Sequence, residues 1–355
     1  MPAPLSPFLI YTLIALVGNA GSTSICFQTL HACGGVSLML EVYVSRKISE
    51  ADGVCSFELL ATNGAQLPAF SAGAHIDVHV APGLVRQYSL CNPSHERGRY
   101  VIAVLDEPAS RGGSKSMHAD VSEGSVLTIG SPRNLFELDL SGERYVLFAG
   151  GIGITPILAM AHTLIAAGKH FELHYCGRSI ERLAFLAVLN ESAFADHLRL
   201  HVDNGPPEQR LDAARILANP AAGDQLYVCG PAGFMSHIQS TAKTSGWSDQ
   251  QINREDFSAP PLSPEGDRPF EIELTRSGRV LVVPSQQTAL EVLLEHDIEI
   301  ESSCEQGICG SCMTRVLAGE PDHRDQYMSA TEHARNDSFT PCCSRSNSPR
   351  LVLDL

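Results

Sequence analysis

Residues 304–312 read Cys-Glu-Gln-Gly-Ile-Cys-Gly-Ser-Cys, and two further cysteines follow at Cys342 and Cys343. Three cysteines in the spacing C-x4-C-x2-C, with a distant fourth, are typical of a plant-type [2Fe–2S] cluster. Two irons need four thiolates, and Gly307 and Gly310 allow the loop backbone to approach the sulfur atoms and to direct N–H groups at them. The pattern predicts an iron–sulfur site whose first three ligands are Cys304, Cys309 and Cys312.

Two other uses of these cysteines stay open from the residues alone. One is a structural zinc site, although zinc sites usually show C-x2-4-C pairs, and the other is a disulfide-closed loop. The fourth ligand is also open, because Cys342 and Cys343 are adjacent and neighbouring side chains of an extended chain point to opposite sides. Eleven cysteines scattered over the chain suit a reducing compartment, so we expect a cytoplasmic protein.

Length and charge narrow the class of protein. A chain of 355 residues is too long for one core and suggests two to four domains. The formal net charge of −15 argues against nucleic-acid binding, which requires a basic surface. An acidic electron carrier instead suits a basic docking surface on a partner protein.

The first 38 residues differ from the rest of the chain. The apolar run 7–17 is too short to span a bilayer, and no Lys or Arg precedes Arg46, so the positive start of a secretory signal is missing. We expect residues 1–38 to be a disordered or spurious extension, with the functional chain starting near Met39. A weak membrane anchor is the alternative.

The chain from 39 to 141 predicts an antiparallel β-barrel. Short apolar segments bounded by Gly, Pro and Asn predict strands at 40–44, 56–61, 75–80, 86–91, 101–105, 126–130 and around Phe136. A short helix is expected at 115–121.

From 142 to 257 the pattern changes to continuous apolar runs that alternate with helical stretches. The runs 145–149, 172–175, 197–202 and 225–229 predict buried parallel strands in a doubly wound α/β domain. A Pro-rich linker, 258–269, follows. The remainder, 270–355, predicts a β-grasp ferredoxin domain with strands at 270–274, 280–283 and 351–355 and a helix at 289–295. The fold class is therefore multidomain, α/β and β.

Two segments of the barrel predict a flavin mononucleotide (FMN) site. Arg86-Gln87-Tyr88-Ser89 offers a cation for a phosphate, an aromatic side chain for the ring and a hydroxyl near its reactive nitrogen, although an ordinary edge strand can have the same sequence. An anion cradle is predicted at Arg111, Gly112, Gly113 and Ser114. The strand Val101–Val104 is expected to bind the ring edge through its backbone.

Two turns of the α/β domain predict a second ligand site. Gly150-Gly151-Ile152-Gly153 lacks the G-x-G-x-x-G spacing, but a glycine-rich turn before a helix still admits a ligand, with Thr155 as its polar group. Cys229-Gly230-Pro231 ends another buried strand at the same carboxyl edge, where ligands bind in such sheets. A tight turn without a ligand, and a core role for Cys229, are the alternatives.

The order of barrel, doubly wound domain and plant-type ferredoxin resembles the phthalate dioxygenase reductase family, which includes vanillate O-demethylase reductases. The resemblance covers residues 39–355. Cys342-Cys343-Ser344-Arg345 is similar to the C-x-S-R motif of the family's ferredoxin domain and selects Cys342 as the fourth ligand. The resemblance implies an NADH- and FMN-dependent reductase that feeds single electrons through the cluster to a Rieske-type oxygenase, one that hydroxylates or O-demethylates an aromatic compound.

The resemblance also implies roles for individual residues. Arg86, Tyr88 and Ser89 would contact FMN, the turn 150–155 and Cys229-Gly230-Pro231 the nicotinamide, and Arg178 the adenosine half. Phe257, in Glu255-Asp256-Phe257, would cover the flavin, so hydride would transfer near Ser89, Cys229 and Phe257 without an acid or base from the protein. Asn253 replaces a histidine that the family often has.

The choice of nucleotides rests on what the sequence lacks. No aromatic or glycine-rich block for an AMP half follows the flavin motifs, which favours FMN over FAD. Apart from Arg178 there is no dense basic cluster for a 2′-phosphate, which favours NADH. We expect a monomer. Two other classes stay open: a self-sufficient flavin and iron–sulfur reductase without a dedicated oxygenase, and a ferredoxin-type docking module whose other domains have lost their cofactors.

Overall fold

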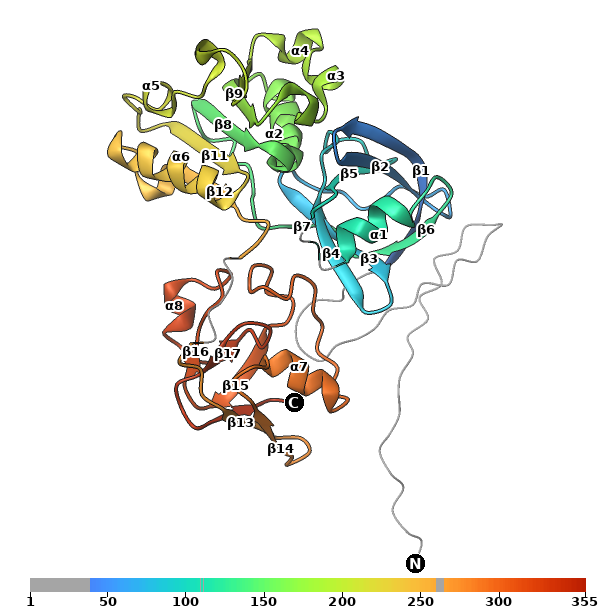
Figure 1. Ribbon diagram of the computed structural model, residues 1–355, viewed down its shortest axis with the longest axis vertical. Helices are drawn as coiled ribbons and strands as arrows, with labels where there is room; N and C mark the ends of the chain where they lie inside the picture. Colours follow the sequence, from blue (N-terminus) through green and yellow to red (C-terminus); the bar gives the residue numbers. More distant parts are fainter. Residues whose placement is uncertain (1–38, 109, 111, 260–264) are drawn as a thin grey trace, which may run out of the picture.

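The computed structural model describes residues 39–108, 110, 112–259 and 265–355, which form three successive folded parts (Figure 1). The N-terminal segment 1–38, Arg111 and positions 260–264 of the expected linker lie outside the described residues. Within the described part of the chain, no helix combines the length and the apolar character needed to cross a membrane. The first and third parts each have their own hydrophobic core. The second part has a core on each face of its sheet, and one of these continues into barrel residues such as Ala103.

The first part is an antiparallel β-barrel, as predicted. Its strands are β1 (Leu40–Ala51), β2 (Val54–Ala61), β3 (Ala74–Ala81), β4 (Leu84–Ser89), β5 (Tyr100–Leu105), β6 (Val126–Ile129) and β7 (Arg133–Asn134), with one helix, α1 (Gly113–Ala119). They lie in the order β4-β3-β6-β1-β2-β5, with β7 beside β3. A bridge between Leu90 and Ile102 joins the two edges and closes the barrel. The strand expected around Phe136 lies just before this residue, at β7, and Phe136 itself lies in a bend where its ring packs against Tyr227.

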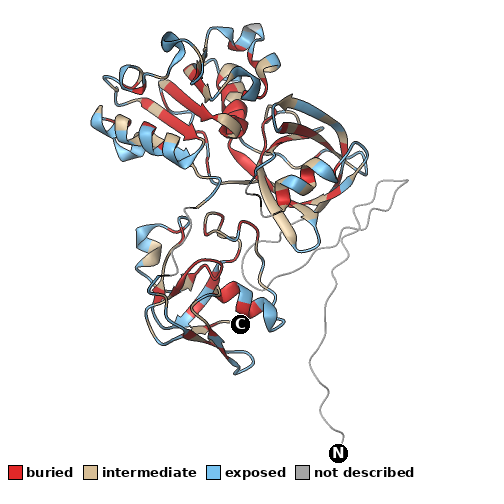
Figure 2. Ribbon diagram, in the orientation of Figure 1, coloured by how far each residue is buried: buried red, intermediate tan, exposed pale blue. Residues whose placement is uncertain are grey.

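The second part is a five-stranded parallel sheet with helices on both faces. Its strands are β8 (Arg144–Gly150), β9 (His170–Gly177), β10 (Leu198–Val202), β11 (Asp224–Cys229) and β12 (Ile252–Glu255), in the order β10-β9-β8-β11-β12. Alternate residues of β8 pack under α2 (Ile154–Ala166) and under α6 (Ala232–Thr244), so the central strands are buried (Figure 2). Short connections contain α3 (Leu186–Leu189), α4 (Ser192–Ala195), α5 (Ala213–Ile216) and the 3₁₀ turns η1 (Gly151–Gly153), η2 (Ile180–Arg182), η3 (Pro207–Gln209) and η4 (Asp249–Gln251).

The order of these strands creates a switch point. From β8 the chain proceeds to β9 and β10 on one side of the sheet, and then to β11 and β12 on the other side. The connections after β8 and β11 therefore leave in opposite directions, which opens a crevice at the carboxyl ends of these two strands. The glycine turns predicted as a ligand site lie at this edge.

The third part is a mixed sheet under a helix, the β-grasp arrangement predicted for a ferredoxin domain. The sheet contains β13 (Phe270–Leu274), β14 (Val280–Val283), β15 (Thr314–Ala318), β17 (Ser338–Phe339) and β19 (Arg350–Leu353), in the order β14-β13-β19-β15-β17. The helix α7 (Ala289–Glu295) has the predicted bounds because Thr288 and Glu291 form a capping box at its start. The remaining elements are β16 (Pro321–Asp322), α8 (Ala330–His333) and β18 (Arg345–Ser346).

The side chain of Arg345 connects several loop segments of this third domain. Its side chain is only 8% exposed and lies 3.5 Å from the carboxylate of Asp267. The guanidinium donates to the backbone carbonyls of Gln287, Pro284 and Arg268, at 2.8, 2.9 and 3.1 Å. A planar group with five donors can satisfy all these acceptors at once, which explains why an arginine stands at this position.

We predict that Arg345→Met lowers the free energy of unfolding of the ferredoxin domain by about 3 kcal/mol, because it leaves three buried carbonyls without their donor. It also removes one of the two guanidinium groups beside Asp267, which keeps its contact with Arg324 at 2.6 Å. Loss of cluster absorbance during thermal unfolding measures the effect. Arg350→Met is the matched control, since Arg350 is 44% exposed and pairs with Glu271 and Glu273 at the surface. Equal destabilisation by both substitutions would contradict this role of Arg345.

Candidate functional site

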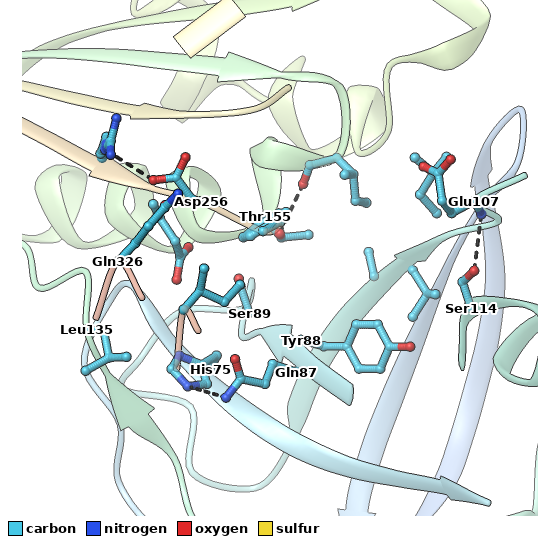
Figure 3. Close-up of a pocket in the computed structure, with 18 of the residues that line it drawn as sticks. His75, Gln87, Tyr88, Ser89, Glu107, Ser114, Leu135, Thr155, Asp256 and Gln326 are labelled. Carbon is cyan, nitrogen blue, oxygen red and sulfur yellow. Dashed lines mark hydrogen bonds and ion pairs between the residues drawn. The ribbon is translucent and has the colours of Figure 1, made fainter. Parts of the chain in front are cut away.

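A cavity of about 470 Å³ lies where the three parts of the chain meet (Figure 3). The barrel contributes a wall from β3, β4 and β5. The parallel-sheet domain contributes Ile152, Thr155 and the segment 254–257. The ferredoxin domain contributes Ile308, Gln326 and Tyr327. Ile308 belongs to the cysteine loop, so the cavity and the predicted cluster site share a wall.

The barrel wall brings together a phenol, a hydroxyl and an imidazole. Tyr88 and Ser89 lie at the end of β4, where Ser89 pairs with His75 of β3. Burial raises the pKa of Tyr88 to about 12, so the phenol stays protonated. Burial, assisted by Arg133, lowers the pKa of His75 to about 4, so the imidazole is neutral at pH 7. These side chains form a polar but uncharged wall.

The backbone of β5 meets the cavity at one end only. Ala103, Val104 and Leu105 line it. Val101 does not: its N–H donates to Asn92 Oδ1 at 2.9 Å, and its carbonyl accepts from the N–H of Cys91. A role for Val104 therefore fits the geometry better than one for Val101.

Arg86 and the turn 112–114 form a cationic end beside this wall. A Cβ on Gly113 would lie 2.5 Å from Cγ of Arg86, so the arginine side chain crosses directly over this glycine. Ser114 lines the cavity, and its Oγ accepts from the N–H of Glu107 at 3.2 Å. A guanidinium, a hydroxyl and turn N–H groups suit a phosphate. Arg111, predicted to belong to this cradle, lies outside the described residues.

The two glycine turns of the parallel sheet are in direct contact. A Cβ on Gly153 would lie 2.3 Å from the carbonyl oxygen of Cys229, so only glycine allows this approach. Thr155 lines the cavity and donates to the carbonyl of Ile152 at 3.1 Å. The other predicted members of this site lie in the same turns, at Gly150, Gly151, Gly230 and Pro231. Arg178 is exposed just after β9, outside the cavity lining.

Glu255 is a feature of the site that the sequence predictions did not include. It ends β12, lines the cavity, and its Oε2 is buried without a hydrogen-bond partner among the described residues. Burial and then Asp256 raise the pKa of this carboxyl to about 8. The neighbouring Cys229 is fully buried, and burial raises the pKa of its thiol well above the ordinary value. Glu255 therefore presents a neutral acid to the cavity at pH 7.

Phe257 completes the site two residues after Glu255. It lines the cavity and remains 40% exposed. His75 was missed because it lies in no recognisable motif, and Glu255 was noted only as the first residue of Glu255-Asp256-Phe257, without a role of its own. The register of β3 against β4 and of β12 against β11 places them here.

The predicted cluster cysteines lie in two pairs. A hydrogen bond with Cys309 raises the pKa of Cys304, and the same interaction lowers that of Cys309. In the second pair, a hydrogen bond with Cys312 is the largest of the interactions that raise the pKa of Cys342. All four residues are buried. Two pairs of sulfur atoms fit a core of two irons, each of which takes two thiolates.

Backbone N–H groups approach the first pair of sulfur atoms. The N–H of Gln306 donates to Sγ of Cys304 at 3.3 Å, and that of Ser311 to Sγ of Cys309 at 3.5 Å. Such bonds stabilise negative charge on sulfur. The residues present therefore fit a [2Fe–2S] cluster.

Cys343 is placed differently from Cys342. Its sulfur lies 3.2 Å from Thr340 Oγ1, and a Cβ on Gly307 would lie 2.5 Å from it. The side chain thus packs beneath the cysteine loop and next to Cys342, whereas Cys342 contacts Cys312. This arrangement favours Cys342 as the fourth ligand.

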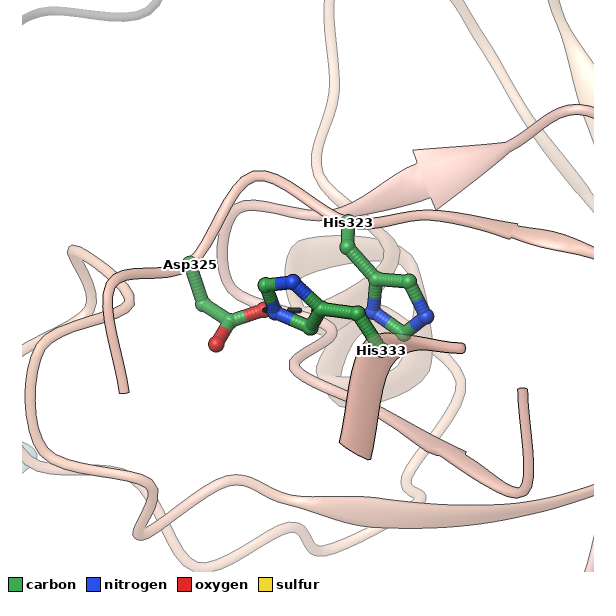
Figure 4. A group of neighbouring side chains, drawn as sticks. All are labelled: His323, Asp325 and His333. Atoms are coloured by element: carbon green, nitrogen blue, oxygen red, sulfur yellow. Dashed lines mark hydrogen bonds and ion pairs between the residues drawn. The ribbon is translucent and has the colours of Figure 1, made fainter. Parts of the chain in front are cut away.

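His323, Asp325 and His333 form a second group of potential metal ligands in the same domain (Figure 4). The two imidazole rings stack with their centres 4.4 Å apart and their planes 17° from parallel, so their in-plane lone pairs do not converge on one point. Instead, His333 Nε2 bonds Asp325 Oδ1 at 3.2 Å. The N–H of the next residue, Gln326, donates to the carbonyl of Gly307. We interpret this group as support beneath the cysteine loop.

Comparison with known proteins gives consistent matches. A family model described as "2Fe-2S iron-sulfur cluster binding domain" matches residues 272–347. Vanillate O-demethylase oxidoreductase of Pseudomonas putida is 54% identical over 318 residues, which cover 89% of this chain and all of the relative.

Two solved structures match as well. The structure of phthalate dioxygenase reductase, described as modular for electron transfer from pyridine nucleotides to [2Fe–2S], matches with a TM-score of 0.71 at 38% identity, covering 89% of this chain and 98% of that one. An intact type IV self-sufficient cytochrome P450 monooxygenase matches with a TM-score of 0.77 at 39% identity, covering 90% of this chain and 41% of that one.

We predict that Glu255→Gln changes how the stability of the flavin-free protein depends on pH. The folded chain keeps a proton on Glu255 that the unfolded chain releases above its ordinary pKa of 4.5, so stability decreases as pH rises toward the folded value of about 8. The decrease is roughly 1.4 kcal/mol per pH unit within this window. Urea unfolding at pH 6.5 and pH 8 should show this decrease in the wild type and a flatter profile in Glu255→Gln. Parallel profiles would contradict a protonated Glu255.

We predict that Cys343→Ser retains the cluster, because the Cys343 sulfur lies 3.2 Å from Thr340 Oγ1, whereas it is Cys342 that forms the hydrogen bond with the predicted ligand Cys312. Cys342→Ser is the matched comparison and should lose the cluster or bind it weakly. Iron and sulfide content, together with visible absorbance, measure both variants. A bleached Cys343→Ser protein beside an intact Cys342→Ser protein would reverse the assignment.

Proposed function

Because the chain belongs to the family of oxygenase reductases that contains vanillate O-demethylase oxidoreductase and phthalate dioxygenase reductase, we propose that it transfers electrons from NADH to a partner oxygenase. The cofactors are FMN and a [2Fe–2S] cluster. The observation that carries this proposal is the single cavity bounded by the flavin barrel, the nucleotide-binding sheet and the cysteine loop.

The protein contributes binding and orientation, while the cofactors provide the redox chemistry. When bound, FMN converts a two-electron hydride into the single electrons that a cluster carries. Arg86 and the turn 112–114 would hold its phosphate, and Tyr88 and Ser89 would position its ring. A cavity of about 470 Å³ lies within the usual size of cofactor sites.

The nucleotide side of the site requires orientation and the exclusion of water. The turn after β8, with Thr155, and the turn Cys229-Gly230-Pro231 would hold the nicotinamide at the switch point. Phe257 would cover the reacting face. The carboxyl of Glu255 is neutral near pH 7, so it adds no charge of its own to a wall that also contains Asp256.

We infer further that the partner is a Rieske-type oxygenase that acts on an aromatic acid or a methoxy-aromatic compound. The similarity to proteins named for vanillate and phthalate supports this substrate class. Residues 270–355 carry twice as many acidic as basic side chains, which suits a basic docking surface on the oxygenase.

The cell compartment and the domain limits complete the proposal. Four cluster thiolates suit a reducing compartment, so the proposal includes a cytoplasmic location. The proposal also includes a monomeric state. The predicted units 39–141, 142–257 and 270–355 would carry FMN, NADH and the cluster respectively.

We predict that Cys304→Ser separates the two redox steps. The variant should reduce ferricyanide with NADH at the wild-type rate, because that reaction needs only the flavin, and it should lose cytochrome c reduction, which needs the cluster. Anaerobic NADH titration of the wild type, followed by visible absorbance and low-temperature EPR, should show flavin bleaching and a reduced [2Fe–2S] signal.

The titration also tests the alternatives. A reducible cluster without flavin or any NADH response would favour a docking module. NADH-driven turnover of quinones or oxygen that an added oxygenase does not accelerate would favour a self-sufficient reductase.

A further inference from the structure

Four side chains connect the barrel to both flanks of the cysteine loop. On the first flank, Ser303 Oγ donates to Asp77 Oδ1 at 2.6 Å. On the second flank, Arg133 Nη1 donates to Ser311 Oγ at 3.2 Å. Arg133 Nη2 also pairs with Asp77 Oδ2 at 2.7 Å, so both contacts start from one ion pair. We call these four residues the interdomain clamp.

The clamp lies close to the cluster ligands. Ser303 immediately precedes Cys304, and Ser311 stands between Cys309 and Cys312. The loop between the two serines carries Ile308, which forms part of the cavity wall. The clamp therefore fixes both ends of the segment whose middle separates the flavin cavity from the cluster site.

The barrel side of the clamp is rigidly supported. Asp77 lies on β3 and Arg133 on β7, which pair directly. Asp77 Oδ1 accepts a second bond, from Gln87 Nε2 at 3.2 Å, and Gln87 lines the cavity. The side chain of Asp77 is 12% exposed, that of Arg133 is 35% exposed, and Ser303 is buried. Partial burial makes this pair stronger than one in water and makes the loss of either partner costly.

The hydrogen bonds on the second flank have a fixed direction. Arg133 can only donate, so Ser311 Oγ accepts from it and keeps its own hydrogen for another acceptor. Cys309 Sγ lies 3.4 Å from Ser311 Oγ. A ligated thiolate is only an acceptor, so the hydroxyl would donate to it while polarised by the guanidinium.

We propose that Asp77 and Arg133 are positioning residues for internal electron transfer: they hold the cluster loop against the flavin cavity and, through Ser311, stabilise negative charge on Cys309. This inference rests on the proposed function, since it requires a flavin in the cavity and a cluster on the cysteines. The two effects are separable, because Asp77 contacts Ser303 and Arg133 but is not hydrogen-bonded to Ser311, so Asp77→Asn tests docking. Ser311 and Arg133 contribute both to docking and to the charge on sulfur.

The test compares Asp77→Asn, Arg133→Gln and Ser311→Ala with the wild-type holoenzyme. Arg99→Gln is the control, because Arg99 pairs with Glu58 and Glu96 elsewhere on the barrel and lies outside the cavity lining. Stopped-flow mixing with NADH resolves flavin reduction from the slower appearance of the reduced cluster. We expect unchanged flavin reduction in all variants. Cluster reduction should be about tenfold slower in Asp77→Asn and Arg133→Gln, because a hydrogen bond to a charged group is worth roughly that factor.

Two further measurements distinguish positioning from general destabilisation. Redox titration by EPR should show a more negative cluster potential in Ser311→Ala and Arg133→Gln, since each loses stabilisation of the reduced, more negative cluster, and no such decrease in Asp77→Asn. Hydrogen exchange of peptides covering 302–312 should be faster in Arg133→Gln and Asp77→Asn than in Arg99→Gln.

Wild-type rates of cluster reduction in both Asp77→Asn and Arg133→Gln would overturn the docking role. Unchanged potentials in both Ser311→Ala and Arg133→Gln would overturn the effect on Cys309. Failure of NADH to reduce the flavin in the wild type would instead count against the proposed function itself, so the two failures are distinguishable.

Discussion

The close contact between the turn after β8 and the end of β11 is the constraint on which the site depends. A Cβ on Gly153 would meet the carbonyl of Cys229 at 2.3 Å, so this contact exists only with glycine. Thr155 follows on one side of the contact. On the other side, Cys229 pairs with Glu255 across β11 and β12. A larger residue at 153 would separate the strand ends and displace two walls of the cavity together.

Burial gives the cavity its chemical character. Tyr88, His75 and Glu255 are all neutral near pH 7, because in each case the main cause of the pKa shift is burial, which disfavours the charged form. Positive charge stays at the end where Arg86 crosses Gly113. Glu107 and the ion pair of Arg254 with Asp256 also line the cavity, so the uncharged wall is one face of it. That face, with Arg86 beside it, suits a ligand that combines a neutral ring system with an anionic tail.

The sequence was a good guide where the pattern is local and a poor one where the contact is distant. The helix at 289–295 and the barrel strands follow from caps, apolar alternation and turn residues. β12 was not predicted from the sequence. It is an edge strand that pairs only with β11, and its residues, Ile-Asn-Arg-Glu, lack the continuous apolar run of a buried strand. Asp77, Arg133 and Ser303 appear ordinary in the sequence, since their importance arises from contact between the barrel and the cysteine loop of another domain. The positions that the predictions grouped as turns do lie together, whereas Val101 and Arg178 lie away from the cavity.

The parallel pairing of β13 with β19 also affects the order in which the domains can fold during synthesis. Ile272 pairs with Leu351, and Arg345 bridges back to Arg268, so the ferredoxin sheet joins residues made far apart in time on the ribosome. The barrel and the parallel sheet are complete in sequence by Glu255, and domains generally fold as units in the order of their synthesis. The flavoprotein half can therefore mature first. The ferredoxin sheet, which needs β19, would then close beside a flavoprotein half that has already folded.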